Sequence, residues 1–339
     1  MTSAGNRKPK IATVIGSDKG GIGKSLIASL LADAYEQARR PLSVIEIDHQ
    51  GKLRTSMGKR VNLSLGASAD LGEIAKDRKY AERFYNPVFN CWRDGDTLTD
   101  LGANVTTQLF NWMQQCHIGE LAAIDDIRFR FVAVTTPDDQ ALRSAYSALC
   151  SAVRQLGEGS EFYLVLNAFS SNRGFDLLEH HPVFKDLANL RQQIALNLLF
   201  IPNCDSDLME YGRARALSPL AVYQERERLI EEMGLGRVEA HTEQKRFVSW
   251  MMEVQESLRP LFVDQQPSTA KADLPSSRSE PAKVHDFPHG EAAERREEMP
   301  RRTYSSTNGA VVEDLLGRRE IEGFDSRPAR RVHAVDRAS

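Results

Sequence analysis

A glycine-rich segment between an apolar run and an amphipathic run constrains the fold more than any other feature of this sequence. The apolar residues IATVI (11–15) predict a buried strand, and the segment GSDKGGIGKS (16–25) follows it directly. Apolar residues then recur at helical spacing from Leu26 to Tyr35. A strand, a tight loop and a helix in this order predict a ligand site at the carboxyl edge of a parallel sheet.

The loop fits the pattern G-x-x-x-x-G-K-[ST], whose backbone N–H groups surround phosphate oxygens. Glycine allows this close approach because a side chain would block it. Lys24 is expected to reach the β and γ phosphates, and the Ser25 hydroxyl to coordinate Mg²⁺. The first turn of the helix presents free N–H groups to the same anion. The residues expected to contact the nucleotide here are Gly20, Gly21, Gly23, Lys24, Ser25 and Leu26.

Composition bounds the class of protein. The chain has 339 residues, of which 41% are hydrophobic, which is enough for one or two domains with a core. A formal net charge of -3 gives no general attraction to nucleic acid. The 4 cysteines have neither metal-site nor disulfide-framework spacing, and no apolar run is long enough for a signal peptide or a membrane span. We therefore expect a cytoplasmic protein.

The composition changes near residue 264 and divides the chain into three parts. Residues 1–10 are predicted to be a disordered N-terminus, and residues 11–263 to form one phosphate-loop domain. Residues 264–339 contain few large apolar side chains, so burial cannot offset their ordering entropy and we expect a disordered tail. Two interpretations stay open for residues 311–324: a short helix near 311–322 that binds a partner, or a solvated segment.

Apolar runs alternate with helical patterns throughout the first 263 residues, which predicts an α/β domain with a doubly wound, mostly parallel sheet flanked by helices. The expected strands are 11–15, 42–47, 97–100, 130–136, 162–168 and 196–202. Helical patterns cover 105–116 and 138–156, and those at 219–234 and 241–262 are expected to pack at the edge of the sheet.

Acidic residues follow two of these strands at the edge where ligands bind. Asp48 ends the second strand, where a carboxylate can orient an attacking water or hold Mg²⁺. Asp100 ends the next strand and is the predicted acid of the Mg²⁺ shell, with Asp96 as the alternative. Gly102 is expected to offer its backbone N–H to the γ-phosphate. An aspartate at a strand end is also a common turn former, so each assignment depends on the others.

The segment Lys19-Gly20-Gly21-Ile22-Gly23-Lys24-Ser25 resembles the deviant phosphate loop K-G-G-x-G-K-[ST] of the ParA/MinD ATPases. The resemblance implies an ATP- and Mg²⁺-dependent ATPase with weak intrinsic turnover that forms a homodimer around the nucleotide. It also implies that Lys19 reaches across the dimer interface to phosphates bound by the other subunit, so that Lys19, Lys24 and Asp48 are the expected catalytic residues.

The similarity extends over about residues 10–260. Asp48-His49-Gln50 is similar to the family's Asp-Pro-Gln, and Asp100-Leu101-Gly102-Ala103 to its Asp-x-Gly-Ala. TTPDDQALRSA (135–145) is similar to the family's fourth-strand motif TTP-x-x-x-S-x-R-x-A. Asn167 matches the asparagine that reads adenine, and residues 201–220, which include Pro202, resemble the segment that closes over the base.

Three functions stay open on the sequence. The first is a switch ATPase that partitions or stabilises plasmid or chromosomal DNA, and the second is an accessory ATPase for conjugal DNA transfer or for positioning another intracellular complex. The third is a nucleotide-dependent binding module with negligible hydrolysis. The partners implied are a second copy of the chain and a stimulating adaptor protein. Nonspecific DNA is a further candidate, although glutamates interrupt the basic residues of the late helices. The C-terminal segment SRPARRVHAVDRAS lacks an apolar face, so direct membrane insertion is not expected.

Overall fold

The computed structural model describes residues 8–66, 77, 79–157, 159–171, 174–178 and 180–262. The predicted tail at 264–339, with its candidate helix, lies outside these residues, as do residues 1–7 of the predicted N-terminal segment. The first strand begins at Lys10, one residue earlier than predicted. Lys10 is held there because its backbone N–H bonds the Asp126 carbonyl at 3.0 Å and its Nζ bonds the Asp125 carbonyl at 2.7 Å.

Seven parallel strands form one sheet in the order β3-β2-β4-β1-β5-β6-β7. They are β1 (Lys10–Gly16), β2 (Ser43–Ile47), β3 (Val61–Leu65), β4 (Thr97–Leu101), β5 (Ile127–Thr135), β6 (Glu161–Asn167) and β7 (Leu196–Ile201). The predicted doubly wound α/β fold is confirmed. The order reverses at β1, which lies between β4 and β5, and ligands of such sheets bind at this switch point.

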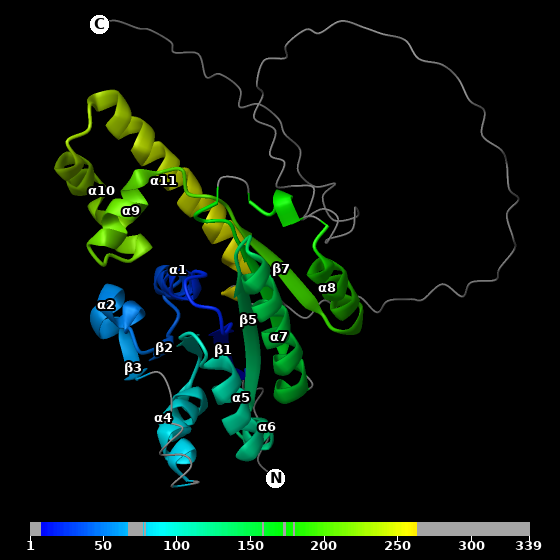
Figure 1. Cartoon of the computed structure of the whole chain (residues 1–339). Helices are drawn as coiled ribbons and strands as arrows, with labels where there is room; N and C mark the ends of the chain where they lie inside the picture. Colours follow the sequence, from blue (N-terminus) through cyan, green and yellow to red (C-terminus); the bar gives the residue numbers. More distant parts are fainter. Residues whose placement is uncertain are drawn as a thin grey trace, which may run out of the picture.

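Helices cover both faces of the sheet (Figure 1). They are α1 (Lys24–Gln37), α2 (Lys52–Met57), α4 (Tyr80–Asp94), α5 (Thr106–Gln115), α6 (Ile118–Ile124), α7 (Asp139–Leu156), α8 (Pro182–Gln193), α9 (Asp207–Ala214), α10 (Pro219–Met233) and α11 (Arg237–Leu258). Short 3₁₀ turns are η1 (Gly58–Arg60), η2 (Asp176–Leu178) and η3 (Arg259–Leu261). No helix within the described residues is long and apolar enough to cross a membrane.

The last two helices differ in part from the prediction. The helix expected at 241–262 begins four residues earlier, at Arg237, where Glu239 accepts a 3.1 Å bond from the Gly236 N–H and so satisfies a group at the helix start. It packs on β7, an edge strand, and also contacts α1. Helix α10 packs mainly against α9 and α1. Helices α9, α10 and α11 therefore lie together, near the top of the view in Figure 1.

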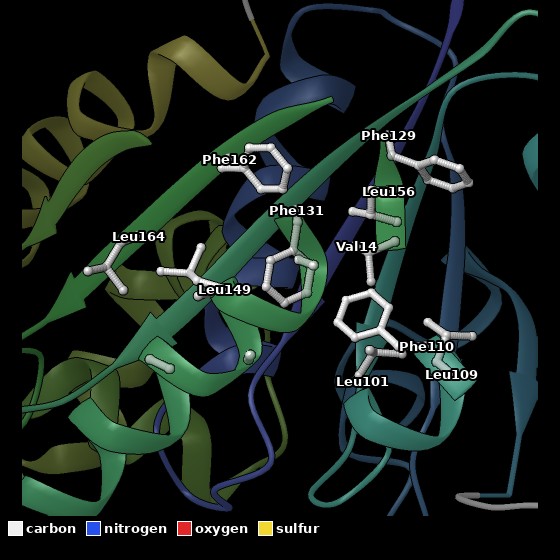
Figure 2. Packing of buried hydrophobic residues seen from close by; sticks show 14 of the residues in the cluster. Val14, Leu101, Leu109, Phe110, Phe129, Phe131, Leu149, Leu156, Phe162 and Leu164 are labelled. Carbon is white, nitrogen blue, oxygen red and sulfur yellow. The ribbon is translucent and has the colours of Figure 1, made fainter. Parts of the chain in front are cut away.

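Two hydrophobic cores lie on opposite faces of the sheet. Side chains of β1 alternate between them: Val14 joins the core under α4, α5 and α7, whereas Ile15 joins the core under α1 and α11. Figure 2 shows Val14 beside Phe110, Phe131 and other aromatic and aliphatic side chains of the first core. The three tryptophans, Trp92, Trp112 and Trp250, are all buried. Both cores hold β1 rigidly, and the loop that follows it starts from a fixed point.

Candidate phosphate-binding site

The loop between β1 and α1 has the backbone that an anion site requires. Gly21 and Gly23 have φ values of 76° and 92°, in the left-handed region that glycine tolerates. A Cβ on Gly23 would also lie 2.3 Å from the Asn167 Nδ2 atom, so only glycine fits there. Gly23 precedes α1, which has no side-chain cap, and the free N–H groups of its first turn therefore remain available to an anion.

Lys24 lies at the start of α1 with 7% of its surface exposed. Its Nζ donates a 2.7 Å hydrogen bond to the Lys19 carbonyl of the same loop. Burial lowers the pKa of Lys24, while the neighbouring carboxylates of Asp100, Asp18 and Asp48 favour its charged form. An ammonium group held in a buried position among carboxylates suits a site that receives several negative charges at once.

Asp100 lies within β4, fully buried at 1% exposure. Burial raises the pKa of this carboxyl to about 7; the hydrogen bond with Ser25 and the charge of Lys24 oppose the rise, and Glu46 and Asp48 add to it. Its Oδ1 has no hydrogen-bond partner among the described residues. A buried carboxylate oxygen without a partner, next to the Ser25 hydroxyl, has the donor chemistry that Mg²⁺ prefers.

The alternative acid, Asp96, lies directly before β4, beyond the end opposite to Asp100. Its Oδ1 accepts a 2.9 Å bond from the Ile11 N–H at the start of β1, and its Oδ2 lies 3.4 Å from Arg40. The structure therefore brings Asp100, and not Asp96, to the phosphate loop. Within the described residues, no three histidine, cysteine or acidic side chains group as a metal cage. Mg²⁺ at this site would accordingly take most of its ligands from phosphate and water, as it commonly does.

Asp48 and Gly102 lie together at the ends of β2 and β4. A Cβ on Gly102 would lie 2.4 Å from the Asp48 Oδ1 atom, so the absence of a side chain lets the carboxylate fold over the β4 turn. The Gly102 N–H donates to the Ile47 carbonyl at 2.8 Å, extending the pairing of β2 with β4. The sequence predicts that this N–H bonds the γ-phosphate; in the structure it has a sheet partner, and the contribution of Gly102 is space for Asp48.

Lys19 contacts α7 in this structure. Its Nζ donates to the Gln140 Oε1 atom at 2.7 Å, and its backbone N–H donates to the Ser144 hydroxyl at 3.1 Å. The Ser17 hydroxyl also bonds Ser144, at 3.0 Å. The sequence interpretation missed Gln140 and Ser144, although their spacing of four residues on a predicted helix places both on one face. The first half of the loop is therefore held by α7.

Asn167, at the end of β6, is buried and packs against the phosphate loop. Its Nδ2 donates to the Ile22 carbonyl at 2.9 Å, and its Oδ1 accepts from the Phe169 N–H at 3.1 Å. One amide hydrogen and one oxygen lone pair remain for a base edge. Pro202, which follows β7, accepts a 3.0 Å bond from the Trp250 indole. The base-reading role of Asn167 and Pro202 stays a prediction.

No protein-family model matches the chain, and no curated protein matches it either. The chain is similar to solved structures of MinD proteins. The cell division ATPase MinD of Pyrococcus furiosus is 14% identical with a TM-score of 0.37, over 74% of this chain and 99% of that one. MinD of Pyrococcus horikoshii with Mg-ADP is 14% identical with a TM-score of 0.39, over 76% and 99%. Cyanthece apo McdA is 14% identical with a TM-score of 0.39, over 72% and 99%. These values are too low to support a function, which is therefore argued from the site.

Proposed function

We propose that this protein is a switch ATPase that binds Mg²⁺ and ATP and hydrolyses the bond between the β and γ phosphates, giving ADP and phosphate. The observation that carries the proposal is that four polar side chains meet at the carboxyl ends of the adjacent strands β2, β4 and β1. They are Lys24, Ser25, Asp48 and Asp100, and the glycine loop beside them leads into the N-terminus of α1. A lone aspartate at a strand end has many explanations. Two aspartates whose charges both act on one buried lysine in a phosphate loop favour phosphoryl chemistry.

Each residue has a separate role in this proposal. Lys24 exchanges its bond to the Lys19 carbonyl for bonds to phosphate oxygens, and the N–H groups at the start of α1 bind the same anion. Ser25 and Asp100 hold the shell of Mg²⁺, which when bound neutralises charge on the phosphates. Asp48, which is only half-buried, orients the attacking water.

Replacing Asp48 by asparagine is expected to lower ATP turnover about 100-fold while leaving ATP binding within about threefold of wild type. The asparagine keeps the size of the side chain and loses the negative charge that orients water. Phosphate release under saturating Mg·ATP and calorimetry with ATPγS measure the two effects. Equal turnover in the two proteins would contradict the role of Asp48, and a wild-type chain that binds no ATP would contradict the function itself.

We also propose that the switch is an ATP-dependent dimer in which Lys19 contacts the nucleotide of the other subunit. The support is that Lys19 is only partly buried and bonds a neutral amide, Gln140, which a phosphate can replace with a stronger, charge-assisted bond. Light scattering is expected to give the 38.0 kDa monomer without nucleotide and twice that mass with Mg·ATPγS. Lys19→Ala is expected to remain monomeric in both conditions, and one constant mass for both proteins would contradict the dimer.

We propose to test first whether the switch partitions DNA. The alternative is that it positions another intracellular complex. The structure pairs several of the late arginines with glutamates: Arg215 with Glu232 at 3.2 Å, and Arg246 with Glu243 at 2.9 Å. Each such pair reduces the positive charge that these helices offer to phosphates. DNA contact thus stays a prediction, as does an adaptor that stimulates turnover, and stimulation of hydrolysis by nonspecific DNA would support the partition role.

A further inference from the structure

The phosphate loop contains a carboxylate, Asp18, that no part of the proposed chemistry uses. A negative charge beside an anion site is unfavourable unless other groups engage it. Its Oδ1 accepts hydrogen bonds from the Thr106 and Thr107 N–H groups at 3.1 and 3.4 Å, and its Oδ2 accepts from the Thr107 hydroxyl at 2.6 Å. The Asp18 carboxylate therefore bonds the first turn of α5.

Helix α5 depends on this contact because it lacks a cap of its own. Val105 occupies the N-cap position and has no side-chain acceptor, so the first N–H groups of the helix are satisfied by a residue 88 positions earlier in the sequence. The backbone repeats the connection, since the Asn104 N–H donates to the Asp18 carbonyl at 3.2 Å. Asp18 thus holds both the β4–α5 turn and the start of α5.

The loop also packs closely against α5 and the turn before it. A Cβ on Gly16 would lie 3.0 Å from the Thr106 hydroxyl, which is tighter than an ordinary contact, and a Cβ on Gly20 would make an ordinary contact, 3.5 Å from the Ala103 Cβ. The same turn also contains Gly102, whose Cα lies against the side chain of Asp48. The β4–α5 turn therefore lies between the phosphate loop and the acid proposed to orient water.

We propose that Asp18 is the positioning residue that fixes the distance between the phosphate loop and the β4–α5 turn, and that this distance makes the site selective for a triphosphate over a diphosphate. The inference rests on the proposed function. In this proposal the β-phosphate is bound mainly by the loop, whereas the terminal phosphate also depends on Asp48, which lies against Gly102 of the turn. Loss of the Asp18 contact would let the turn move relative to the loop, and the γ-phosphate, which needs both, would lose contacts first.

The test compares Asp18→Ala with Asp18→Asn, using ATPγS and ADP with Mg²⁺ in calorimetry. Alanine is expected to weaken ATPγS binding at least about tenfold and to leave ADP binding within about twofold. Asparagine keeps the acceptor for the two N–H groups, and its amide can donate to the Thr107 hydroxyl, so it is expected to retain the wild-type ratio of the two affinities. Amide exchange at Thr106 and Thr107 is expected to accelerate about tenfold in the alanine variant only.

The outcomes separate this inference from the proposed function. A wild-type chain that prefers ATPγS together with an Asp18→Ala chain of unchanged preference would overturn the inference and leave the function intact. Equal weakening of both nucleotides by Asp18→Ala would assign Asp18 a merely structural role and would also overturn it. An Asp18→Asn chain that behaves like the alanine variant would show that charge, and not position, matters. A wild-type chain that binds neither nucleotide would overturn the function and the inference with it.

Discussion

Replacing Lys24 by methionine is expected to lower the rate of ATP hydrolysis about 100-fold or more, measured as phosphate release at saturating Mg·ATP. The methionine retains most of the apolar stem but removes a buried ammonium group whose charged form is favoured by Asp100, Asp18 and Asp48. Without it, the triphosphate would meet the carboxylates of Asp48 and Asp100 without the positive charge of Lys24 between them. Electrostatic repulsion then raises the free energy of the transition state, where the charge on the transferred group is spread over its oxygens.

The matched control is Lys245→Met, the same substitution on the exposed face of α11. This control is expected to retain wild-type turnover, because Lys245 is exposed to solvent and has no role in the proposed phosphate site. Circular dichroism verifies that both variants fold. If Lys24→Met retained at least half of the wild-type rate, the proposed role of the loop would be wrong.

The strand–loop–helix unit could be predicted from the sequence because every determinant of it is local. The apolar period of β1, the glycines at left-handed positions and the spacing to Lys24 lie within 20 residues. Strand β3 could not be predicted in the same way. Its residues VNLSL are only partly buried, so they lack the continuous apolar run of a strand covered on both faces.

The contacts around the loop could not be predicted because they depend on strand order. Asp18 contacts Thr106, 88 residues later in the sequence, because β1 pairs with β4. This pairing places the turn that follows β4 beside the phosphate loop that follows β1. Gln140 and Ser144 reach Lys19 because β5 is the other neighbour of β1. The same placement explains why Asp100 and Asp96, four residues apart, have different surroundings: Asp100 lies near the carboxyl end of β4, and Asp96 directly precedes its first residue. Sequence spacing alone identifies the polar residues, and topology selects among them.

Replacing Asp100 by asparagine is expected to stabilise the nucleotide-free protein increasingly as the pH rises. Burial raises the pKa of Asp100 to about 7 from an ordinary value of 3.8. Between these values the unfolded chain has released the proton and the native chain still holds it. Since the native state binds more protons, the contribution of this group to stability is fully present below pH 4 and is lost as the pH rises to 7. Asparagine carries no proton to lose, so urea unfolding is expected to show a gap between the two proteins that grows from near zero at pH 4 to about 3–4 kcal/mol at pH 8.

When Mg·ATPγS is present, Asp100→Asn is expected to be less stable than the wild-type protein. In the wild-type protein the Asp100 carboxylate then lies beside Mg²⁺, and binding of the nucleotide stabilises the native state by mass action. An amide is a weaker ligand for Mg²⁺ than a carboxylate, so Asp100→Asn is expected to gain much less thermal stability from the nucleotide. Opposite signs in the two conditions would identify Asp100 as a residue that lowers stability in order to bind a metal. A gap that does not change with pH, or equal stabilisation of both proteins by Mg·ATPγS, would show that its buried oxygen has another purpose.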